Sequence, residues 1–231
     1  MRICLKLSGE AFANSQGFGF DTKKVLSLID QIKKLIKKKH EIIIICGAGN
    51  IFRGRERKEF EIGRYRADQM GMLSTLVNAL FLEQLFLKAK QPVKILNSFE
   101  NRFVEKYRVE KALEYLKKER VIICSGGLGH PYFTTDSLAA LRARELRADK
   151  VLKATNVDGV YDKDPKKSKA AKRFSTLTFS KALSLELNIM DLSAFALLKE
   201  GNIEICVFDL FQKNAIIDAV EKSKGTTIKG V

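Results

Sequence analysis

Residues Glu41–Asn50 read EIIIICGAGN, an unbroken run of β-branched residues that ends in a glycine-rich segment. A strand that is apolar on both faces is typical of the interior of a parallel sheet. Glycines directly after such a strand predict a tight loop that lets the backbone approach a ligand closely. A helix pattern precedes the run: Asp21 is its expected N-cap, and apolar side chains recur along one face. This stretch predicts an α/β protein.

The same order of strand, loop and helix continues along the chain. Further strands are expected at 2–7, 93–96, 120–125, 150–154, 204–208 and 226–228, and further helices at about 68–90, 105–118, 135–147, 179–187, 193–200 and 214–220. We find no internal repeat and no linker. The alternation predicts a single domain over residues 1–231, folded as a three-layer α/β/α sandwich with a largely parallel central sheet.

Bulk properties restrict the cellular setting. No uninterrupted apolar run approaches the roughly 18 residues of a membrane span, and the opening MRICLKLSGE does not resemble a signal peptide. The chain is therefore expected to be cytoplasmic and to have no membrane partner. The four cysteines lie in or beside apolar runs and form no CxxC pair, so we predict free, buried thiols in a reducing compartment.

The chain carries 42 Lys and Arg against 27 Asp and Glu, a net charge of +15. Such a balance favours an anionic partner. The charge is spread along the chain, however, and no nucleic-acid-binding motif accompanies it. A solvated lysine-rich surface is the simpler interpretation, and nucleic acid is not the expected partner.

Ligands of parallel α/β sheets bind at the carboxyl ends of the strands. The segments to inspect are therefore Ser8-Gly9, Gly47–Arg53, Gly126–Thr135 and Thr155–Asp164, most of them glycine-rich. Neither a Walker A loop nor a Rossmann GxGxxG motif is present. Backbone N–H groups of such loops can hold phosphate, and a following helix N-terminus adds its dipole.

Three features near these loops have a functional and a structural interpretation. Lys6 lies in an apolar strand, where its ammonium group needs an anion, although a lysine at a strand edge could instead reach solvent. Arg53 could grip a phosphate or simply face solvent. The segment Thr134-Thr135-Asp136 lies at the start of a predicted helix. It could bind a phosphate, or it could simply cap the helix. No Ser-His-Asp set is identifiable, which suits phosphoryl transfer, where positioning and charge neutralisation dominate.

Taken together, several blocks resemble the bacterial-type UMP kinases (uridylate kinases) of the amino-acid kinase superfamily. The similarity covers nearly the whole chain, in order. The blocks are LKLSGEA at 5–11, GFGFD at 17–21, GAGNIFRG at 47–54, ADQMGML at 67–73, PYFTTDS at 131–137, ADKVLKATNVDGVY at 148–161, IMDLSAF at 189–195 and GTTI at 225–228.

The resemblance implies ATP-dependent phosphorylation of UMP to UDP by direct in-line transfer, in pyrimidine nucleotide biosynthesis. It implies an acceptor-side lobe over about 1–147 and an ATP-side lobe over about 148–231. The resemblance implies four catalytic residues, Lys6, Arg53, Asp136 and Lys153. The residues it implies for ATP binding are Lys6, Leu7, Ser8, Gly9, Gly49, Arg53, Thr155, Tyr161 and Asp164. The residues it implies for UMP binding are Ala48, Asp68, Leu128, Gly129, His130, Pro131, Tyr132, Phe133, Thr134 and Thr135. Asp191 matches a family carboxylate to which we assign no role from the sequence.

The resemblance further implies that Mg²⁺ arrives on ATP without a metal site of the protein's own. It also implies a homohexamer that is activated by GTP and inhibited by UTP.

Three residues depart from the family pattern. Ala48 replaces a glycine, and Leu128 and His130 replace a threonine and an asparagine in the segment that wraps UMP, where His130 could donate to a phosphate. Two other hypotheses stay open at this point. One is a related kinase for an amino acid, carbamate or a small phosphate, and the other is a basic regulatory protein that binds nucleotides or DNA without catalysis.

Overall fold

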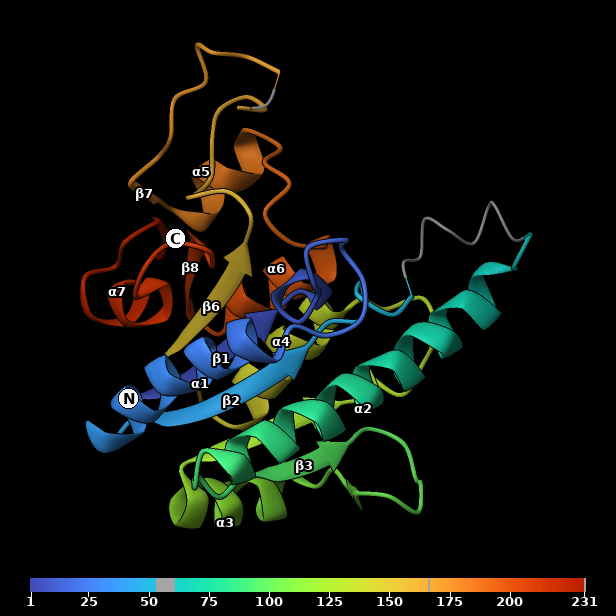
Figure 1. Cartoon of the computed structure of the whole chain (residues 1–231). Coiled ribbons are helices and arrows are strands. Elements are labelled where there is room, and N and C mark those ends of the chain that lie inside the picture. Colours follow the sequence, from blue (N-terminus) through green and yellow to red (C-terminus); the bar gives the residue numbers. More distant parts are fainter. Residues whose placement is uncertain (53–60, 166, 231) are drawn as a thin grey trace.

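The computed structural model describes residues 1–52, 61–165 and 167–230. Its described part contains one nine-stranded sheet in the order β4-β3-β5-β2-β1-β6-β8-β9-β7 (Figure 1). All neighbouring strands run parallel except β8 and β9. The strands are β1 Arg2–Leu7, β2 Glu41–Cys46, β3 Lys94–Asn97, β4 Glu105–Lys106, β5 Val121–Ser125, β6 Lys150–Thr155, β7 Thr176–Leu177, β8 Glu204–Asp209 and β9 Thr226–Ile228.

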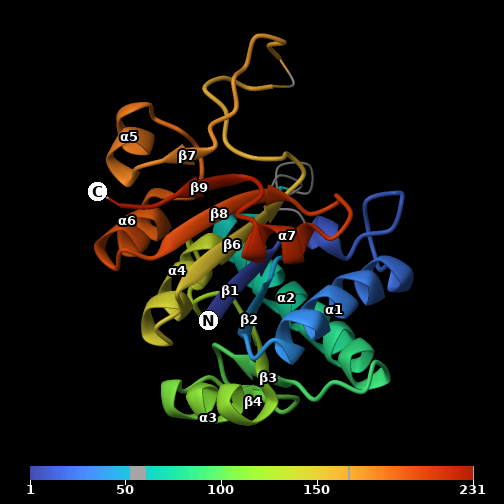
Figure 2. The same ribbon diagram turned by 90° about the vertical axis from the view of Figure 1, so that its left-hand side faces the viewer.

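Helices cover both faces of the sheet (Figures 1 and 2). One apolar core joins the sheet to α1, α2 and α7, and a second joins its other face to α3, α4, α5 and α6. The predicted three-layer sandwich is confirmed. The helices are the short 3₁₀ turn η1 Gly9–Ala11, α1 Thr22–Lys37, α2 Arg64–Lys88, α3 Val109–Glu119, α4 Thr135–Glu145, α5 Phe179–Ser184, α6 Leu192–Glu200 and α7 Ala215–Glu221.

The central strands follow from their sequence. In β2 every residue from Ile42 to Cys46 is buried, as expected of a strand with helices on both faces. Asp21 is the N-cap of α1 and accepts a hydrogen bond from the backbone N–H of Lys24 at 3.0 Å. Both features agree with the sequence-based prediction.

The helix predicted at 105–118 is wrong at its start. Residues Glu105 and Lys106 form β4, which pairs in parallel with the end of β3, and α3 begins only at Val109. The backbone N–H of Tyr107 donates to the carbonyl of Asn97 at 2.8 Å, which continues this pairing. Pairing with the preceding strand therefore overrides the local helix pattern.

Helix α2 is long and apolar enough to cross a membrane by length and composition alone. It packs on α1 and on β2, β3 and β5. Burial of side chains such as Ala79, Leu82 and Phe86 in the core accounts for much of its apolar composition. A core helix of a soluble domain meets the same criterion.

The four cysteines are buried free thiols in β1, β2, β5 and β8, as predicted. Burial raises the pKa of all four, to about 12 for Cys124 and about 11 for Cys206. Thiolate is the reactive form, so these side chains should be inert in the native protein.

We expect Ellman's reagent at pH 8 to leave the native protein unlabelled and to titrate four thiols once guanidinium chloride unfolds it. Rapid labelling of native protein at any one position would contradict the buried placement of that cysteine.

Candidate active site

Two lysines lie side by side at the carboxyl ends of neighbouring strands. Strands β1 and β6 pair in parallel, with Lys6 in register with Lys153. Leu5 and Leu7 pack into the core on the face that carries α1. Because side chains alternate along a strand, Lys6 points to the opposite face, and Lys153 does so by the same rule. Both ammonium groups therefore face α4.

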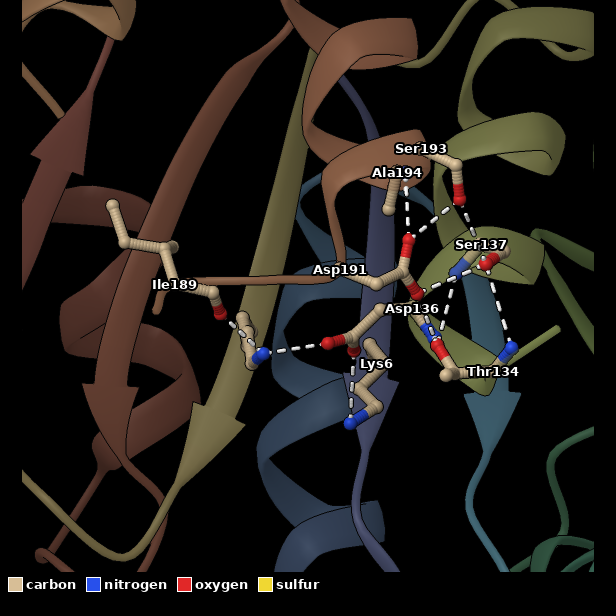
Figure 3. Close-up of polar contacts among 9 residues, drawn as sticks. Lys6, Thr134, Asp136, Ser137, Ile189, Asp191, Ser193 and Ala194 are labelled. Atoms are coloured by element: carbon tan, nitrogen blue, oxygen red, sulfur yellow. Dashed lines mark hydrogen bonds and ion pairs between the residues drawn. The ribbon is translucent and has the colours of Figure 1, made fainter. Parts of the chain in front are cut away.

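Asp136, in the first turn of α4, lies between these lysines, and Figure 3 shows its contact with Lys6. Its Oδ1 is 3.0 Å from Nζ of Lys6, and its Oδ2 accepts a hydrogen bond from Nζ of Lys153 at 2.6 Å. All three side chains are at most 15% exposed. Two cations against one anion leave this centre with a net positive charge, which suits a phosphate ligand.

Burial by itself would raise the pKa of Asp136, but the charges of Lys6 and Lys153 outweigh it and hold this pKa below its ordinary value. Burial lowers the pKa of Lys153, and Lys6 adds to this effect while Asp136 opposes it. The carboxyl group is therefore ionised at neutral pH, and it is the charge that stabilises two ammonium groups so close together.

The segment before α6 contacts the same centre (Figure 3). The carbonyl of Ile189 accepts a hydrogen bond from Nζ of Lys153. Asp191 is the N-cap of α6 and accepts from the backbone N–H of Ala194 at 2.8 Å. Its other oxygen accepts from the hydroxyls of Thr134, the N-cap of α4, and of Ser137.

Two glycine loops meet beside the lysines. A Cβ atom on Gly9 would lie 2.1 Å from the backbone nitrogen of Gly49, and one on Gly47 would lie 2.8 Å from that of Gly9. Both positions therefore require glycine because of close backbone contact. Buried Asn78 of α2 fixes the second loop: its amide donates to the carbonyl of Gly47 at 2.7 Å and pairs reciprocally with Asn50.

The lysines and glycine loops line a cavity of about 630 Å³. Its wall contains Lys6, Ser8, Gly9, Glu10, Gly47, Ala48, Gly49, Phe52, Ala67, Asp68, Gly71, Met72, Thr75, Gly127, Phe133, Thr134, Thr135, Lys153, Ala154, Thr155 and Asn156. A second cavity of about 530 Å³ is lined by Asn156, Val157, Asp158, Tyr161, Pro165, Arg173, Phe208, Asp209, Gln212, Ala215, Lys224 and Gly225. Asn156 is common to both, so the two cavities adjoin.

Asp68 of α2 is held at the edge of the first cavity. Its Oδ2 accepts from the backbone N–H of Tyr132 at 2.7 Å, and Arg64 donates to the carbonyl of Tyr132 at 3.2 Å. The Arg64 guanidinium also lies over the Tyr132 ring, 5.1 Å from its centroid. These contacts fasten the loop before α4 to the start of α2.

Most of the residues predicted to bind ATP line one of the two cavities. Lys6, Ser8, Gly9, Gly49 and Thr155 line the first cavity, and Tyr161 lines the second. Leu7 packs into the core, so only its backbone can reach a ligand. The Thr155 hydroxyl donates to the carbonyl of Val157 at 2.7 Å. Asp164 is in neither lining, although the next residue, Pro165, is in the second.

On the acceptor side, Ala48, Asp68, Phe133, Thr134 and Thr135 line the first cavity. Leu128 packs against the core on the α4 face. The remaining predicted residues are not in the lining of either cavity; they are Gly129, His130, Pro131 and Tyr132. Arg53 lies outside the described residues.

Sequence reasoning missed most of the second cavity. Asp209 ends β8 and Gln212 follows it, and the Gln212 amide donates to the Asp209 carboxylate at 2.9 Å. The rule that ligands bind beyond the carboxyl ends of strands applies to this segment too, and it would have identified both residues. Arg173 and Lys224 reach the cavity through the packing of β7 and β9 beside β8, which no local pattern reveals.

A parallel α/β sheet, glycine loops at its carboxyl edge and two lysines on the wall of the first of two adjoining cavities are typical of a phosphotransferase of the kinase type. The amino acid kinase family model matches residues 1–209, and the chain belongs to this family.

Three solved structures show how far the likeness extends. UMP kinase from Ureaplasma parvum is 38% identical, with a TM-score of 0.94 over 99% of this chain and 98% of that one. UMP kinase from Bacillus anthracis is 31% identical, with a TM-score of 0.93 over 99% and 95% of the two chains. Uridylate kinase from Archaeoglobus fulgidus shares the fold at 24% identity, with a TM-score of 0.75 over 99% and 100%.

The contact between the glycine loops predicts that Gly9→Ala impairs activity. The added methyl group would overlap the backbone at Gly49 and displace both loops. Misplacement by about 1 Å can cost about 100-fold in rate, so we expect kcat/KM for ATP to fall by about that factor.

Gly63→Ala is the matched control, because a Cβ at Gly63 meets nothing within 4 Å. Steady-state kinetics of both purified variants provide the measurement. Equal kcat/KM values for the two variants would contradict a functional contact between the loops.

Proposed function

We propose that this protein transfers the γ-phosphoryl group of ATP to UMP and forms UDP and ADP. The similarity over nearly the whole chain to two UMP kinases, at 38% and 31% identity, carries this proposal. The two adjoining cavities support it, because a nucleotide kinase must hold two nucleotides with their phosphates facing each other.

The arrangement of the cavities supports separate binding sites for the two nucleotides, formed by different parts of the chain. The first is lined mostly by residues before 147 and the second by residues from 156 to 225. We assign UMP to the first and the adenosine part of ATP to the second, with acceptor-side and ATP-side lobes over about 1–147 and 148–231. The phosphates then meet near Lys6 and Lys153.

In this assignment the reaction is a direct in-line displacement. An oxygen of the UMP phosphate attacks the γ-phosphorus, the bond from that phosphorus to the β,γ-bridging oxygen breaks, and ADP leaves. The attacking oxygen is already an anion, so no general base is needed. Lys6 and Lys153 offset the charge of the transferring group, Asp136 orients them, and backbone N–H groups of the glycine loops hold ATP phosphates. We propose that the Arg53 guanidinium adds a further positive charge that offsets the charge of the phosphates.

On the acceptor side, Asp68 supplies the polar anchor. One of its oxygens is engaged by Tyr132 and, among the described residues, the other has no hydrogen-bond partner. That oxygen can accept a hydrogen bond from a ribose hydroxyl of UMP. The Thr134-Thr135 segment at the start of α4 can receive the UMP phosphate.

Mg²⁺ enters with ATP in this proposal. Among residues 1–52, 61–165 and 167–230, no group of three or more His, Cys, Asp or Glu could hold a metal ion. Both oxygens of Asp136 face ammonium groups. In this proposal the nucleotide phosphates hold the Mg²⁺ ion, as is usual for magnesium at kinase sites.

We propose a cytoplasmic homohexamer that GTP activates and UTP inhibits. Assembly and regulation are taken from the family resemblance, and the compartment from the composition of the sequence. An exposed apolar row on α2 supports self-association: Met70, Leu73 and Val77 recur at helical spacing and are 40%, 55% and 47% exposed. Contact with another copy would bury this row.

We expect Lys6→Ala to lower kcat by about 100- to 1,000-fold, the usual cost of removing one preorganised charge donor from an active site. Lys150→Ala is the matched control. Lys150 is a buried lysine of β6 paired with Glu204 at 2.7 Å, at the other end of the strand from Lys153. Its loss should lower the melting temperature and leave kcat of the folded enzyme unchanged. Normal turnover in Lys6→Ala would refute the role of Lys6.

A coupled assay of ADP release with UMP, CMP and dCMP as acceptors, with and without GTP, tests the reaction itself. We expect UMP to give the highest kcat/KM. A strong preference for another acceptor would contradict the proposed substrate. Absence of turnover together with salt-sensitive DNA binding would favour a regulatory protein instead.

A further inference from the structure

Asp191 contacts the start of two helices at once. One of its oxygens caps α6 by accepting from Ala194, and also accepts from the hydroxyl of Ser193 at 2.8 Å. The other oxygen accepts from the hydroxyls of Thr134 and Ser137, which belong to the first turn of α4. A single carboxylate thereby joins the N-termini of α4 and α6, which pack on each other (Figure 3).

These contacts lead directly to the catalytic centre. The Thr134 hydroxyl that Asp191 holds is itself the cap of α4, and it accepts from the backbone N–H of Asp136 at 3.0 Å. Two residues before Asp191, the carbonyl of Ile189 accepts from Nζ of Lys153. The segment 189–191 therefore contacts Lys153 directly and reaches Asp136 through the Thr134 cap.

Asp191 itself is absent from the lining of both cavities. It must therefore act through the groups it holds. Burial by itself would raise its pKa, but the hydrogen bonds from Thr134, Ala194, Ser193 and Ser137 outweigh this and lower it. The carboxylate is charged at neutral pH.

We infer that Asp191 is a positioning residue for phosphoryl transfer: it fixes the first turn of α4 so that Asp136 stands between Lys6 and Lys153, and it places a second negative charge near Lys153. This inference rests on the proposed function. It assigns a task to a carboxylate that the transfer reaction does not otherwise use.

The second part of the inference concerns the protonation of Lys153. The charged groups that face Lys153 are Asp136, Lys6 and Asp191. Burial lowers the pKa of Lys153 most, Asp136 raises it, Lys6 lowers it, and Asp191 raises it. Removing the charge of Asp191 should lower this pKa further, so that Lys153 loses its proton at a lower pH than in the wild type.

The decisive variant is Asp191→Asn. Asparagine is also a good N-cap, so α6 keeps its cap, while the oxygen that receives Thr134 and Ser137 becomes an NH₂ group. We expect kcat to fall by about 10- to 100-fold from misalignment of the centre, with KM values for ATP and UMP changed by less than about threefold. We also expect the alkaline limb of the kcat–pH profile to move to lower pH.

Two further variants separate alignment from charge. Ser137→Ala removes one hydroxyl that Asp191 holds but keeps the carboxylate, so kcat should fall while the alkaline limb stays in place. Asp21→Asn removes the same charge from the N-cap of α1, which has no contact with the centre, and should leave both kcat and the pH profile unchanged.

Unchanged kcat and pH profile in folded Asp191→Asn would overturn the inference. So would a lower melting temperature with normal kcat per folded molecule, since that result would make Asp191 a purely structural cap. If Asp191→Asn does not fold, normal kcat in Ser137→Ala overturns the inference instead. Wild-type enzyme that does not turn over UMP would refute the proposed function, and it is measured first.

Discussion

The proposed catalytic centre depends on one carboxylate between two ammonium groups. Lys6 and Lys153 lie on neighbouring strands because β1 and β6 pair in register, and burial would make two such cations repel each other strongly. Asp136 compensates for one charge and contacts both lysines. It can do so only because α4 begins at this edge of the sheet. The ion pairs are thus a consequence of strand order and of where one helix starts.

The surrounding architecture keeps this arrangement rigid. Close backbone contact between Gly9 and Gly49 joins the loops after β1 and β2, and the buried Asn50–Asn78 pair anchors the second loop to α2. A buried ion pair contributes little net stability, because desolvation offsets the attraction. Its role here is orientation: the charges are in place before a nucleotide binds, so the protein need not reorganise during transfer.

Local sequence patterns correctly predicted the buried central strands and the cap of α1. They failed where the structure of a segment depends on its contact with another part of the chain. The limits of β1 and β2 were predicted because their apolar runs are unambiguous, and Asp21 was recognised as a cap. Strand β4 was missed because Glu105 and Lys106 extend only by pairing with β3. Lys6 could be selected from its place in an apolar strand, and Asp136 from its place at the start of a helix. Their pairing with Lys153, and the link through Asp191, depend on strand register and on the packing of α6, which no linear pattern encodes.

Two of the three departures from the family pattern, Leu128 and His130, lie outside the linings of both cavities. Ala48 lines the first cavity, yet it is not among the described non-glycine residues with positive φ, so alanine adds a methyl group there without backbone strain. Leu128 packs on the core, and His130 is exposed outside the lining of either cavity. In the proposed assignment, polar recognition of the acceptor falls to Asp68 and the Thr134-Thr135 segment, which the chain retains. Because Tyr132 occupies only one oxygen of Asp68, that carboxylate can hold the loop and a ribose hydroxyl at the same time.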